Sequence, residues 1–320
     1  MSEELILGID GGGSKVLIAL ANKSGRIVRS SRGRGINPMD NPDWHRELEQ
    51  QLLPFRNQTG LMAIAAALPA YGEVAHFSQL QRSAIESVFP NVRQQVLNDV
   101  DAAHLGAFAG APGILILSGT GSMAWARDDK GQSARTGGWG HMIGDEGSSH
   151  WIGQGALNLV SQSLDGRTSA TTLAKALLVH LGIDTADPMN GLGGWVSCLS
   201  NPRADIAAIS TLVDQVAQGG DEGAIRLIEQ AADELAKHHR AIASHCSAAR
   251  WTYAGGTFSS RLLLEALERR IGTPPTIPKL PPIGGALLVA AKLLNWPLDE
   301  GWFGQIAATA ENAAAHLDNN

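Results

Sequence analysis

Short apolar runs that end in glycine-rich turns dominate the first part of the chain. Residues 5–9 form one such run, which ends at Asp10-Gly11-Gly12-Gly13. A second apolar run covers 16–21, and a third strand-like stretch covers 26–30, each after a short polar turn. This spacing predicts three consecutive strands joined by tight turns, a β-meander.

The same order of elements returns in the middle of the chain. Residues 113–117 form an apolar run that ends at Ser118-Gly119-Thr120-Gly121-Ser122, and residues 123–127 form its partner strand before a polar hairpin turn at 128–131. A strand, a glycine turn, a strand and a polar turn therefore occur twice. This pattern predicts an internal duplication.

Apolar residues at helical spacing fill most of the remaining chain. The spacing predicts helices at about 43–58, 77–89, 102–109, 147–163, 171–181, 203–218, 221–248, 259–271, 283–294 and 303–316, and further strands at 61–68, 92–97 and 250–254. The chain is broken at Gly110-Ala111-Pro112-Gly113. We therefore expect a domain boundary at about 112–118, with a first domain over 1–115 and a second over 116–291.

The composition narrows the class of protein. Of the 320 residues, 44% are hydrophobic and 18% are charged, which is typical of a globular protein. The net charge of −6 and the absence of a dense Lys/Arg run argue against nucleic-acid binding. No apolar stretch has the length of a membrane span, and the first residues lack the basic region of a signal peptide, so we expect a cytoplasmic protein.

The two cysteines, Cys198 and Cys246, lie far apart and form no C-x-x-C pair. This spacing disfavours a zinc site or an iron–sulfur cluster within one chain. Two scattered thiols fit a reducing compartment, where we expect them to be small buried side chains. No sequence pattern determines the oligomeric state, and a homodimer is one of the states that the sequence allows.

Two glycine-rich turns have the composition of loops that bind phosphate. Glycines let backbone N–H groups approach an anion, and a serine or threonine beside them adds a hydroxyl donor. The first turn consists of Asp10, Gly11, Gly12, Gly13, Ser14 and Lys15, and the second of Ser118, Gly119, Thr120, Gly121 and Ser122. Asp10, at the end of a strand, is placed to hold Mg²⁺ through water.

Each turn alone is equally consistent with a tight hairpin whose glycines have positive φ. Neither has the spacing of a Walker A loop, and neither opens a helix as a dinucleotide-binding fingerprint does. Because one such turn occurs in each copy of the duplicated pattern, we favour a pair of loops that clamp a polyphosphate from two sides.

Asn98 and Asp99 follow a predicted strand. A carboxylate at this place can accept the proton of a sugar hydroxyl as its oxygen attacks phosphorus, and the asparagine can fix the sugar by hydrogen bonds. The alternative is a cap for the helix expected from Ala102, for which Asp101 is the better candidate.

Residues 137–148 combine five glycines with tryptophan, histidine and two carboxylates. This composition suits a loop around a small polar ligand. His141 is also consistent with a structural histidine, and Glu146 with a helix-dipole partner. Asn37, before a proline, is placed for a ligand contact or for a turn.

Residues 254–260 run from a strand through a glycine pair into a helix. Glycines here let a flat nucleoside lie against the backbone. The alternative is that Thr257 or Ser259 caps the following helix.

Taken in their order along the chain, these motifs resemble those of the N-acetylglucosamine kinase branch of the BadF/BadG/BcrA/BcrD ATPase family. The resemblance is carried by I-D-G-G-G-S-K at 9–15, G-x-N-P at 35–38, N-D-x-x-A-A at 98–103, S-G-T-G-S at 118–122, G-G-W-G-H-x-x-G-D-E-G-S at 137–148 and A-G-G-x-x-S at 254–259. It covers about residues 5–290. The G-G-W-G-H-x-x-G-D-E-G-S stretch is the most specific motif.

The resemblance implies an α/β fold of two ribonuclease-H-like (actin-like ATPase) domains, each a mixed sheet flanked by helices, around a central cleft. It also implies that a C-terminal helix, at about 292–316, packs on the first domain. The implied activity is ATP- and Mg²⁺-dependent phosphorylation of an amino sugar, N-acetylglucosamine or, as the nearest alternative, glucosamine.

The resemblance also assigns roles to residues of this chain. Asp99 is the implied catalytic base, with Asp101 as its rival because D-A-A at 101–103 also fits a base-bearing segment. The implied ATP- and phosphate-binding residues are Asp10, Gly11, Gly12, Gly13, Ser14, Lys15, Gly119, Thr120, Gly121, Gly255, Gly256 and Ser259. The implied sugar-binding residues are Asn37, Asn98, Ser122, Gly138, Trp139, Gly140 and Asp145.

Two other functions share this fold. An ATP-driven activator of a reductase or dehydratase needs cysteines that bind an iron–sulfur cluster, and the two thiols here lie in helical stretches without glycine-rich ligand loops. A sugar-sensing repressor carries an added helix-turn-helix segment, and the first strand is expected already at residue 5. Both are therefore disfavoured.

Overall fold

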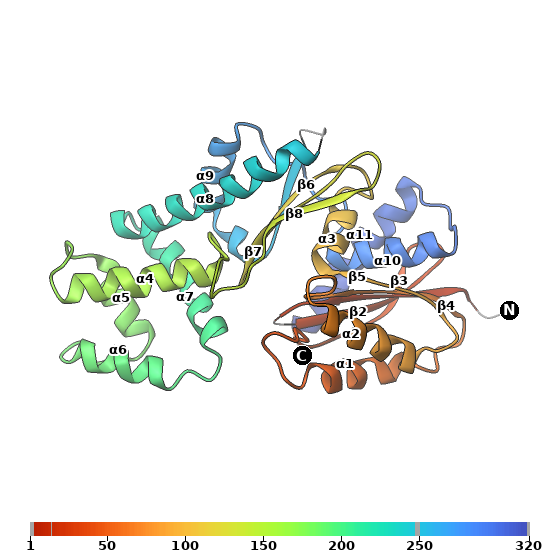
Figure 1. Ribbon diagram of the computed structural model, residues 1–320, viewed down its shortest axis with the longest axis horizontal. Helices are drawn as coiled ribbons and strands as arrows, with labels where there is room; N and C mark the ends of the chain where they lie inside the picture. Colours follow the sequence, from red (N-terminus) through yellow and green to blue (C-terminus); the bar gives the residue numbers. More distant parts are fainter. Residues whose placement is uncertain (1–2, 14, 247–249, 319–320) are drawn as a thin grey trace. The chain divides into compact units, whose positions relative to one another are not determined.

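The computed structural model describes residues 3–13, 15–246 and 250–318. The chain divides into two compact units. Unit 1 consists of residues 1–113 and 277–320, and unit 2 of residues 114–276. Each unit has one sheet with helices packed on it (Figure 1). The prediction for Ser14 lies outside the described residues.

Unit 1 has a five-stranded sheet in the order β3-β2-β1-β4-β5. The strands are β1 (Leu5–Gly11), β2 (Lys15–Asn22), β3 (Ile27–Arg34), β4 (Leu61–Leu68) and β5 (Arg93–Asn98). The first three strands are antiparallel neighbours and form the predicted meander, whereas β4 lies parallel to both β1 and β5. The sheet is therefore mixed, as predicted.

Both faces of this sheet are covered, because the side chains of its strands alternate between two apolar clusters. Leu7, Ile9 and Ile64 face one cluster with α1 (Trp44–Leu52) and α2 (Ala75–Val88). Ile6, Ala63 and Ala65 face the other, with α3 (Asp99–Ala107), α10 (Pro282–Leu293) and α11 (Glu300–Asp318). Figure 1 shows α1 and α2 on one side of the sheet and α10 on the other.

Unit 2 has a four-stranded sheet in the order β8-β7-β6-β9. Its strands are β6 (Gly113–Ser118), β7 (Ser122–Arg127), β8 (Ser133–Gly137) and β9 (Trp251–Ala254). β6 and β9 are parallel, and β7 and β8 are antiparallel. The order matches β3-β2-β1-β4 of unit 1 strand for strand. The duplication and the mixed-sheet α/β fold predicted from the sequence are confirmed.

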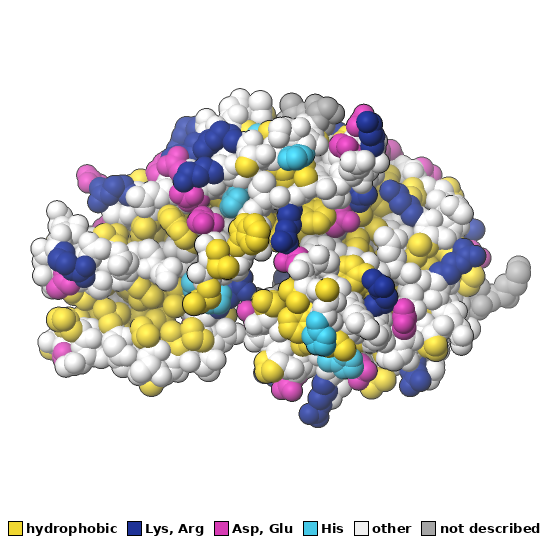
Figure 2. Space-filling view, in the orientation of Figure 1, with side chains coloured by type: hydrophobic (Ala, Val, Ile, Leu, Met, Phe, Trp, Pro, Cys, Tyr) yellow, Lys and Arg dark blue, Asp and Glu magenta, His cyan; other side chains and the backbone are white. Residues whose placement is uncertain are grey.

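Helices make up most of unit 2. They are α4 (Ser149–Leu164), α5 (Thr172–His180), α6 (Pro188–Ser197), α7 (Pro202–Gln218), α8 (Glu222–Ile242) and α9 (Arg261–Ile271). One apolar cluster joins Ile116, Ala124 and Trp251 of the sheet to these helices. α6 contributes no buried residue. Hydrophobic side chains reach the surface over α5 and α6 (Figure 2), among them Val179, Met189 and Val196.

The C-terminal segment begins to pack on unit 1 earlier than about 292. Residues 277 onward belong to that unit, because α10 lies against β1 and α3. At this contact, a side chain on Gly8 of β1 would meet Leu287 at 2.9 Å. α10 therefore covers the middle of the first sheet. The last helix, α11, packs on unit 1 as well.

Three further differences from the sequence-based expectations have local causes. α3 begins at Asp99, because the side chain of Asn98 accepts a hydrogen bond from Val100 N (2.9 Å) and caps it. Asp101 is therefore not the cap. α6 was not predicted, since its glycines obscure the helical pattern. Cys246 is buried as expected, whereas Cys198 is exposed.

In the part of the chain that the structure describes, no helix combines the length and the apolar character needed to span a membrane.

Candidate functional site

Asp10 lies near the carboxyl end of β1 and Asp99 directly follows the carboxyl end of β5, two parallel strands with β4 between them. Asp10 is the second-last residue of β1, where it pairs with Ala67 of β4, and Leu68 of β4 pairs with Asn98 at the end of β5. Parallel strands end at the same edge of a sheet, which is where ligands bind in α/β folds. The topology of unit 1 therefore brings the predicted base and the predicted Mg²⁺ ligand to one edge.

Burial raises the pKa of both carboxyl groups. Burial raises the pKa of Asp10 from 3.8 to about 6, and the charge of Lys15 offsets part of this rise. Burial also raises the pKa of Asp99, to about 7, with further contributions from the negative charges of Asp10 and Glu73. A carboxyl group that titrates near pH 7 is suited to general-base chemistry.

The raised pKa values predict how stability depends on pH in the absence of ligands. Between about pH 4 and pH 7 the folded chain binds more protons at Asp99 than the unfolded chain, so the free energy of unfolding falls as pH rises through this range. Asn cannot ionise. We expect Asp99→Asn to be more stable than wild type at pH 8 by about 1 kcal/mol or more. Urea unfolding at pH 5 and pH 8 measures this difference, which should shrink at pH 5.

Asn98 is held by three hydrogen bonds within unit 1. Its Nδ2 donates to Tyr71 O (3.0 Å) and to Glu73 Oε1 (3.0 Å), and its Oδ1 accepts from Val100 N (2.9 Å). The side chain is only 6% exposed. These bonds use both of its N–H groups, so the geometry favours a supporting role for Asn98 over direct hydrogen bonding to a sugar.

The first glycine turn lies against the segment that carries Asn37. Gly12 N donates to Lys15 O (2.8 Å), and Ile36 N donates to Gly12 O (3.1 Å). Gly11 has no room for a side chain, because a Cβ would lie 2.8 Å from Ile36 Cδ1. Gly11, Gly12 and Gly13 all lack a positive φ. Close packing and backbone access, not left-handed conformation, therefore account for these glycines.

Asn37 forms part of a turn and also faces the glycine loop. Its Nδ2 donates to Asp40 Oδ2 (2.6 Å), and its Oδ1 accepts from Met39 N (3.1 Å). A side chain at Gly13 would meet both Asp40 and Asn37 at about the van der Waals distance, 3.8 and 4.0 Å. Asp40 is therefore a polar neighbour of this loop that the sequence motifs did not single out.

The second glycine turn is joined to two other predicted segments within unit 2. Gly119 N donates to Gly121 O (2.9 Å) and closes the turn. Gly119 O accepts from Ser149 N (2.8 Å), at the start of α4, and from Thr257 Oγ1 (3.2 Å). The hydroxyl groups of Ser149 and Thr257 also bond to each other at 2.6 Å. Three glycine-rich segments, far apart in sequence, therefore meet around Gly119.

Asp145 anchors the loop 137–148 to the second glycine turn. It has a φ of +65°, which is unusual for a residue with a side chain, and is only 3% exposed. One of its carboxylate oxygens lies 2.9 Å from Arg203 Nη2, and the other accepts weakly from Ser122 N at 3.4 Å. A Cβ on Gly121 would touch this ion pair at 2.8 to 3.0 Å.

The polar groups around Asp145 are thus engaged within unit 2. The Ser122 hydroxyl donates to Glu146 O (2.7 Å), and Gly138 N donates to Ser122 O (3.0 Å). Arg203, in the first turn of α7, is a site residue that the sequence motifs missed. Arg203 and Asp145 lie 58 residues apart in the sequence, and no local spacing of residues indicates such a pair.

The outer part of the same loop is exposed. Trp139, Met142 and Ile143 are 65%, 85% and 77% exposed, and the Arg135 guanidinium lies 5.9 Å from the Trp139 ring centre. A side chain on Gly140 would meet nothing within 4 Å. Exposed apolar side chains on a glycine-rich loop can pack against the face of a sugar ring.

The structure places His141 at the surface and Glu146 ahead of the first turn of α4. His141 is exposed and its ring lies 5.2 Å from that of His150, which is buried. Burial and the nearby His141 lower the pKa of His150. Glu146 precedes the helix, because Ser148 caps α4 by accepting from Trp151 N (3.1 Å).

The segment 254–260 has a backbone that only glycine accommodates. Gly255 has a φ of +106°, and a side chain there would overlap the carbonyl oxygen of Ser118. Ser259 Oγ donates back to Gly256 O (2.8 Å). The cap of α9 is Ser260, which accepts from Leu263 N at 3.2 Å and bonds to Asp214. The expected caps, Thr257 and Ser259, therefore do not serve that helix.

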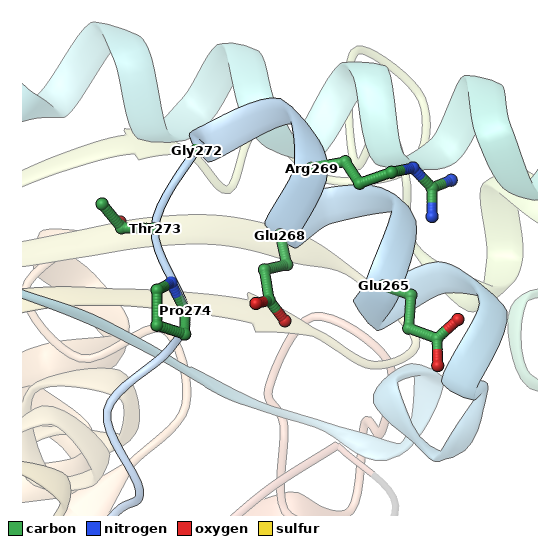
Figure 3. Close-up of a pocket in the computed structure, with 6 residues that line it drawn as sticks. All are labelled: Glu265, Glu268, Arg269, Gly272, Thr273 and Pro274. Atoms are coloured by element: carbon green, nitrogen blue, oxygen red, sulfur yellow. The ribbon is translucent and has the colours of Figure 1, made fainter.

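A surface pocket at the end of α9 contains none of these residues (Figure 3). It is lined by Glu265, Glu268, Arg269, Gly272, Thr273 and Pro274. Arg269 bonds to Glu229 at 2.8 Å. This pocket is therefore unrelated to the glycine-rich turns.

A model of the BadF/BadG/BcrA/BcrD ATPase family matches residues 7–290. The chain is 28% identical over 236 residues to an N-acetylmuramic acid/N-acetylglucosamine kinase of Clostridium acetobutylicum, covering 72% of this chain and 76% of the relative. It is 26% identical over 255 residues to a glucosamine kinase of Vibrio cholerae, covering 75% and 82%.

Solved structures agree with this assignment. A protein of Chromobacterium violaceum, provisionally named as an N-acetylglucosamine kinase, superposes with a TM-score of 0.73 at 27% identity over 90% of this chain and 100% of that chain. A glucokinase of Streptomyces griseus shares the fold, with a TM-score of 0.62 at 14% identity over 90% and 98%. With a family model that spans most of its length, the chain belongs to the BadF/BadG/BcrA/BcrD ATPase family.

Proposed function

We propose that this protein is an ATP-dependent kinase that transfers a phosphoryl group to the 6-hydroxyl of N-acetylglucosamine, with glucosamine as the alternative substrate. The observation that carries the proposal is the carboxyl group of Asp99, which stands beside Asp10 at the end of parallel strands and titrates at about pH 7. The family membership and the names of the relatives support the same reaction.

In this proposal, Asp99 accepts the proton of the attacking hydroxyl. With a pKa of about 7, the group is partly ionised at neutral pH and holds a transferred proton without a large energetic penalty. We favour Asp99 over Asp101 as the base, because Asp99 directly follows the strand end. Catalysis of phosphoryl transfer depends mainly on positioning and on charge stabilisation, which the surrounding residues supply.

Each unit contributes a phosphate-binding turn in this proposal. In unit 1, Gly11, Gly12, Gly13 and Lys15 offer backbone N–H groups and one cationic side chain. In unit 2, Gly119, Thr120 and Gly121 offer a second turn, and Gly255, Gly256 and Ser259 border the adenosine. Asn37, Gly138, Trp139, Gly140 and Asp145 line the sugar, whereas Asn98 and Ser122 support their neighbours through the bonds described above.

The residues of unit 1 fit a magnesium ion that accompanies ATP. Burial raises the pKa of both Asp10 and Asp99, so a nearby cation would stabilise their ionised forms. Asp10 would hold the ion through water, and the ion would neutralise charge on the phosphates. The cytoplasmic location expected from the sequence, and a homodimer, are compatible with this function.

Release of ADP from purified protein with MgATP tests the proposal. N-acetylglucosamine, glucosamine, N-acetylmannosamine and glucose are given in parallel, together with a sample without sugar. We expect turnover that depends on sugar and is fastest with N-acetylglucosamine. Faster turnover with glucosamine would establish the alternative substrate, and turnover with none of the four would contradict the proposal.

A further inference from the structure

The loop between β4 and α2, residues 69–74, has a strained backbone that several hydrogen bonds hold in place. Ala70 has a φ of +61° and Gly72 a φ of +81°. Gln81, which is fully buried, donates to Pro69 O (2.8 Å), and Gly72 N donates to Ser78 Oγ (2.8 Å). Left-handed conformation at alanine is unfavourable and persists only where the surroundings fix it. The surroundings therefore fix the conformation of this loop.

The loop carries the carboxylate of Glu73. Its Oε1 accepts a hydrogen bond from Asn98 Nδ2 at 3.0 Å, and the same Nδ2 donates to Tyr71 O of the loop at 3.0 Å. The buried Asn98 side chain is thus held from the side of the loop by a carboxylate and by a backbone carbonyl. A hydrogen bond to an ionised acceptor is stronger than one between neutral groups.

Asn98 is connected to Asp99 through the backbone N–H of Val100. Its Oδ1 accepts from Val100 N (2.9 Å) and caps α3, of which Asp99 is the first residue. The Asp99 carboxylate also accepts from Val100 N at 2.9 Å, so both side chains share one backbone donor. If Asn98 rotates, the first turn of α3 loses this cap, and the Val100 N–H that also bonds the Asp99 carboxylate is no longer held by Asn98.

We propose that Glu73 is a positioning residue for Asp99, acting through Asn98 and the first turn of α3. This inference rests on the proposed function, since it assigns Glu73 to the same reaction. Glu73 does not take the proton of the substrate in this proposal. It keeps one rotamer of Asn98, and thereby keeps the carboxylate of Asp99 in place for the attacking hydroxyl. A displacement of a reactive group by about 1 Å can lower the rate by about 10²-fold.

Four variants test the role of Glu73: Glu73→Ala, Glu73→Gln, Asn98→Ala and the double variant Glu73→Ala/Asn98→Ala. Glu86→Ala, which removes one exposed carboxylate from α2, is the matched control for charge. We expect Glu73→Ala to lower kcat about 10- to 100-fold with the KM for ATP changed less than about 3-fold. Glu73→Gln retains an acceptor oxygen for Asn98 and should recover most of kcat.

The double variant separates a shared path from two independent effects. Because both residues act through the same cap, the double variant should be little worse than the more impaired single variant. Additive losses would contradict the path through Asn98. A Glu73→Gln variant as slow as Glu73→Ala would also overturn the proposal, because the charge or a direct substrate contact would then be the important property. A wild-type rate in Glu73→Ala would exclude any role.

A measurement without turnover distinguishes failure of this inference from failure of the kinase function. Amide hydrogen exchange at residues 99–103 reports the first turn of α3. We expect faster exchange there in Glu73→Ala, but not in Glu73→Gln or Glu86→Ala. If the wild-type protein phosphorylates no sugar and this exchange pattern is still seen, the kinase function fails while the path from Glu73 to α3 stands. Equal exchange in all variants would refute the path itself.

Discussion

Replacing Asp99 by asparagine is expected to lower kcat for sugar phosphorylation by about 10²- to 10⁴-fold, the usual contribution of a general base. Asparagine has nearly the same shape and retains an oxygen for the bond from Val100 N. It cannot take a proton. The KM for ATP should therefore change little, and steady-state kinetics with saturating sugar measure the loss.

Asp101→Asn is the matched control for this experiment. Asp101 also lies in the first turn of α3, two residues beyond Asp99. We expect it to keep at least about a tenth of the wild-type kcat, well above the Asp99→Asn rate. If Asp101→Asn abolishes turnover and Asp99→Asn does not, the base has been assigned to the wrong carboxylate.

Gly285→Ala should give the largest loss of stability among single glycine substitutions in unit 1. Gly285 of α10 faces α3, and an added Cβ would overlap the carbonyl oxygen of Ala102 and lie 2.8 Å from Gly106 N. Both obstacles belong to the backbone, so one helix must move. Overpacking typically destabilises by about 1–3 kcal/mol, and we expect a value at or above the upper end. Denaturant unfolding measures it.

Gly304→Ala is the control for the intrinsic effect of alanine in a helix. Gly304 lies in α11, and a Cβ there would meet nothing within 4 Å. Alanine favours helix by about 1 kcal/mol over glycine, so this variant should be as stable as wild type or more stable. Equal effects of the two substitutions would show that the contact between α10 and α3 tolerates a methyl group.

The sequence predicted strands better than it predicted helix ends. β4 occurs at 61–68 as expected, because eight consecutive apolar or small residues form a strand that is buried on both faces. The start of α3 was placed three residues late, since a composition rich in alanine draws attention to 102–109 and not to the capping side chain of Asn98. α6 was missed because Gly191, Gly193 and Gly194 weaken the helical pattern.

The candidate site was predictable where it consists of contiguous motifs. The topology of unit 1 places Asp10 and Asn98-Asp99 at the ends of β1 and β5, which both run parallel to β4 between them, as short motifs at strand ends imply. Glu73 and Arg203 were not predictable, because each bonds to a partner far away in sequence, Asn98 and Asp145 respectively. Sequence motifs identify groups that are contiguous in the chain, whereas long-range pairs emerge only once the chain is folded.

The discontinuity of unit 1 has a consequence for how the chain folds during its synthesis. One face of the first sheet is covered by Leu280, Ile283, Leu287, Trp302 and Ile306, which the ribosome adds after all of unit 2. Unit 2 is continuous in sequence and can complete its core while that face still exposes Ile6, Ala63 and Ala65. Exposed apolar strands are prone to aggregation. Until its last helices are made, the nascent chain therefore leaves covered only the part of this face that α3 reaches.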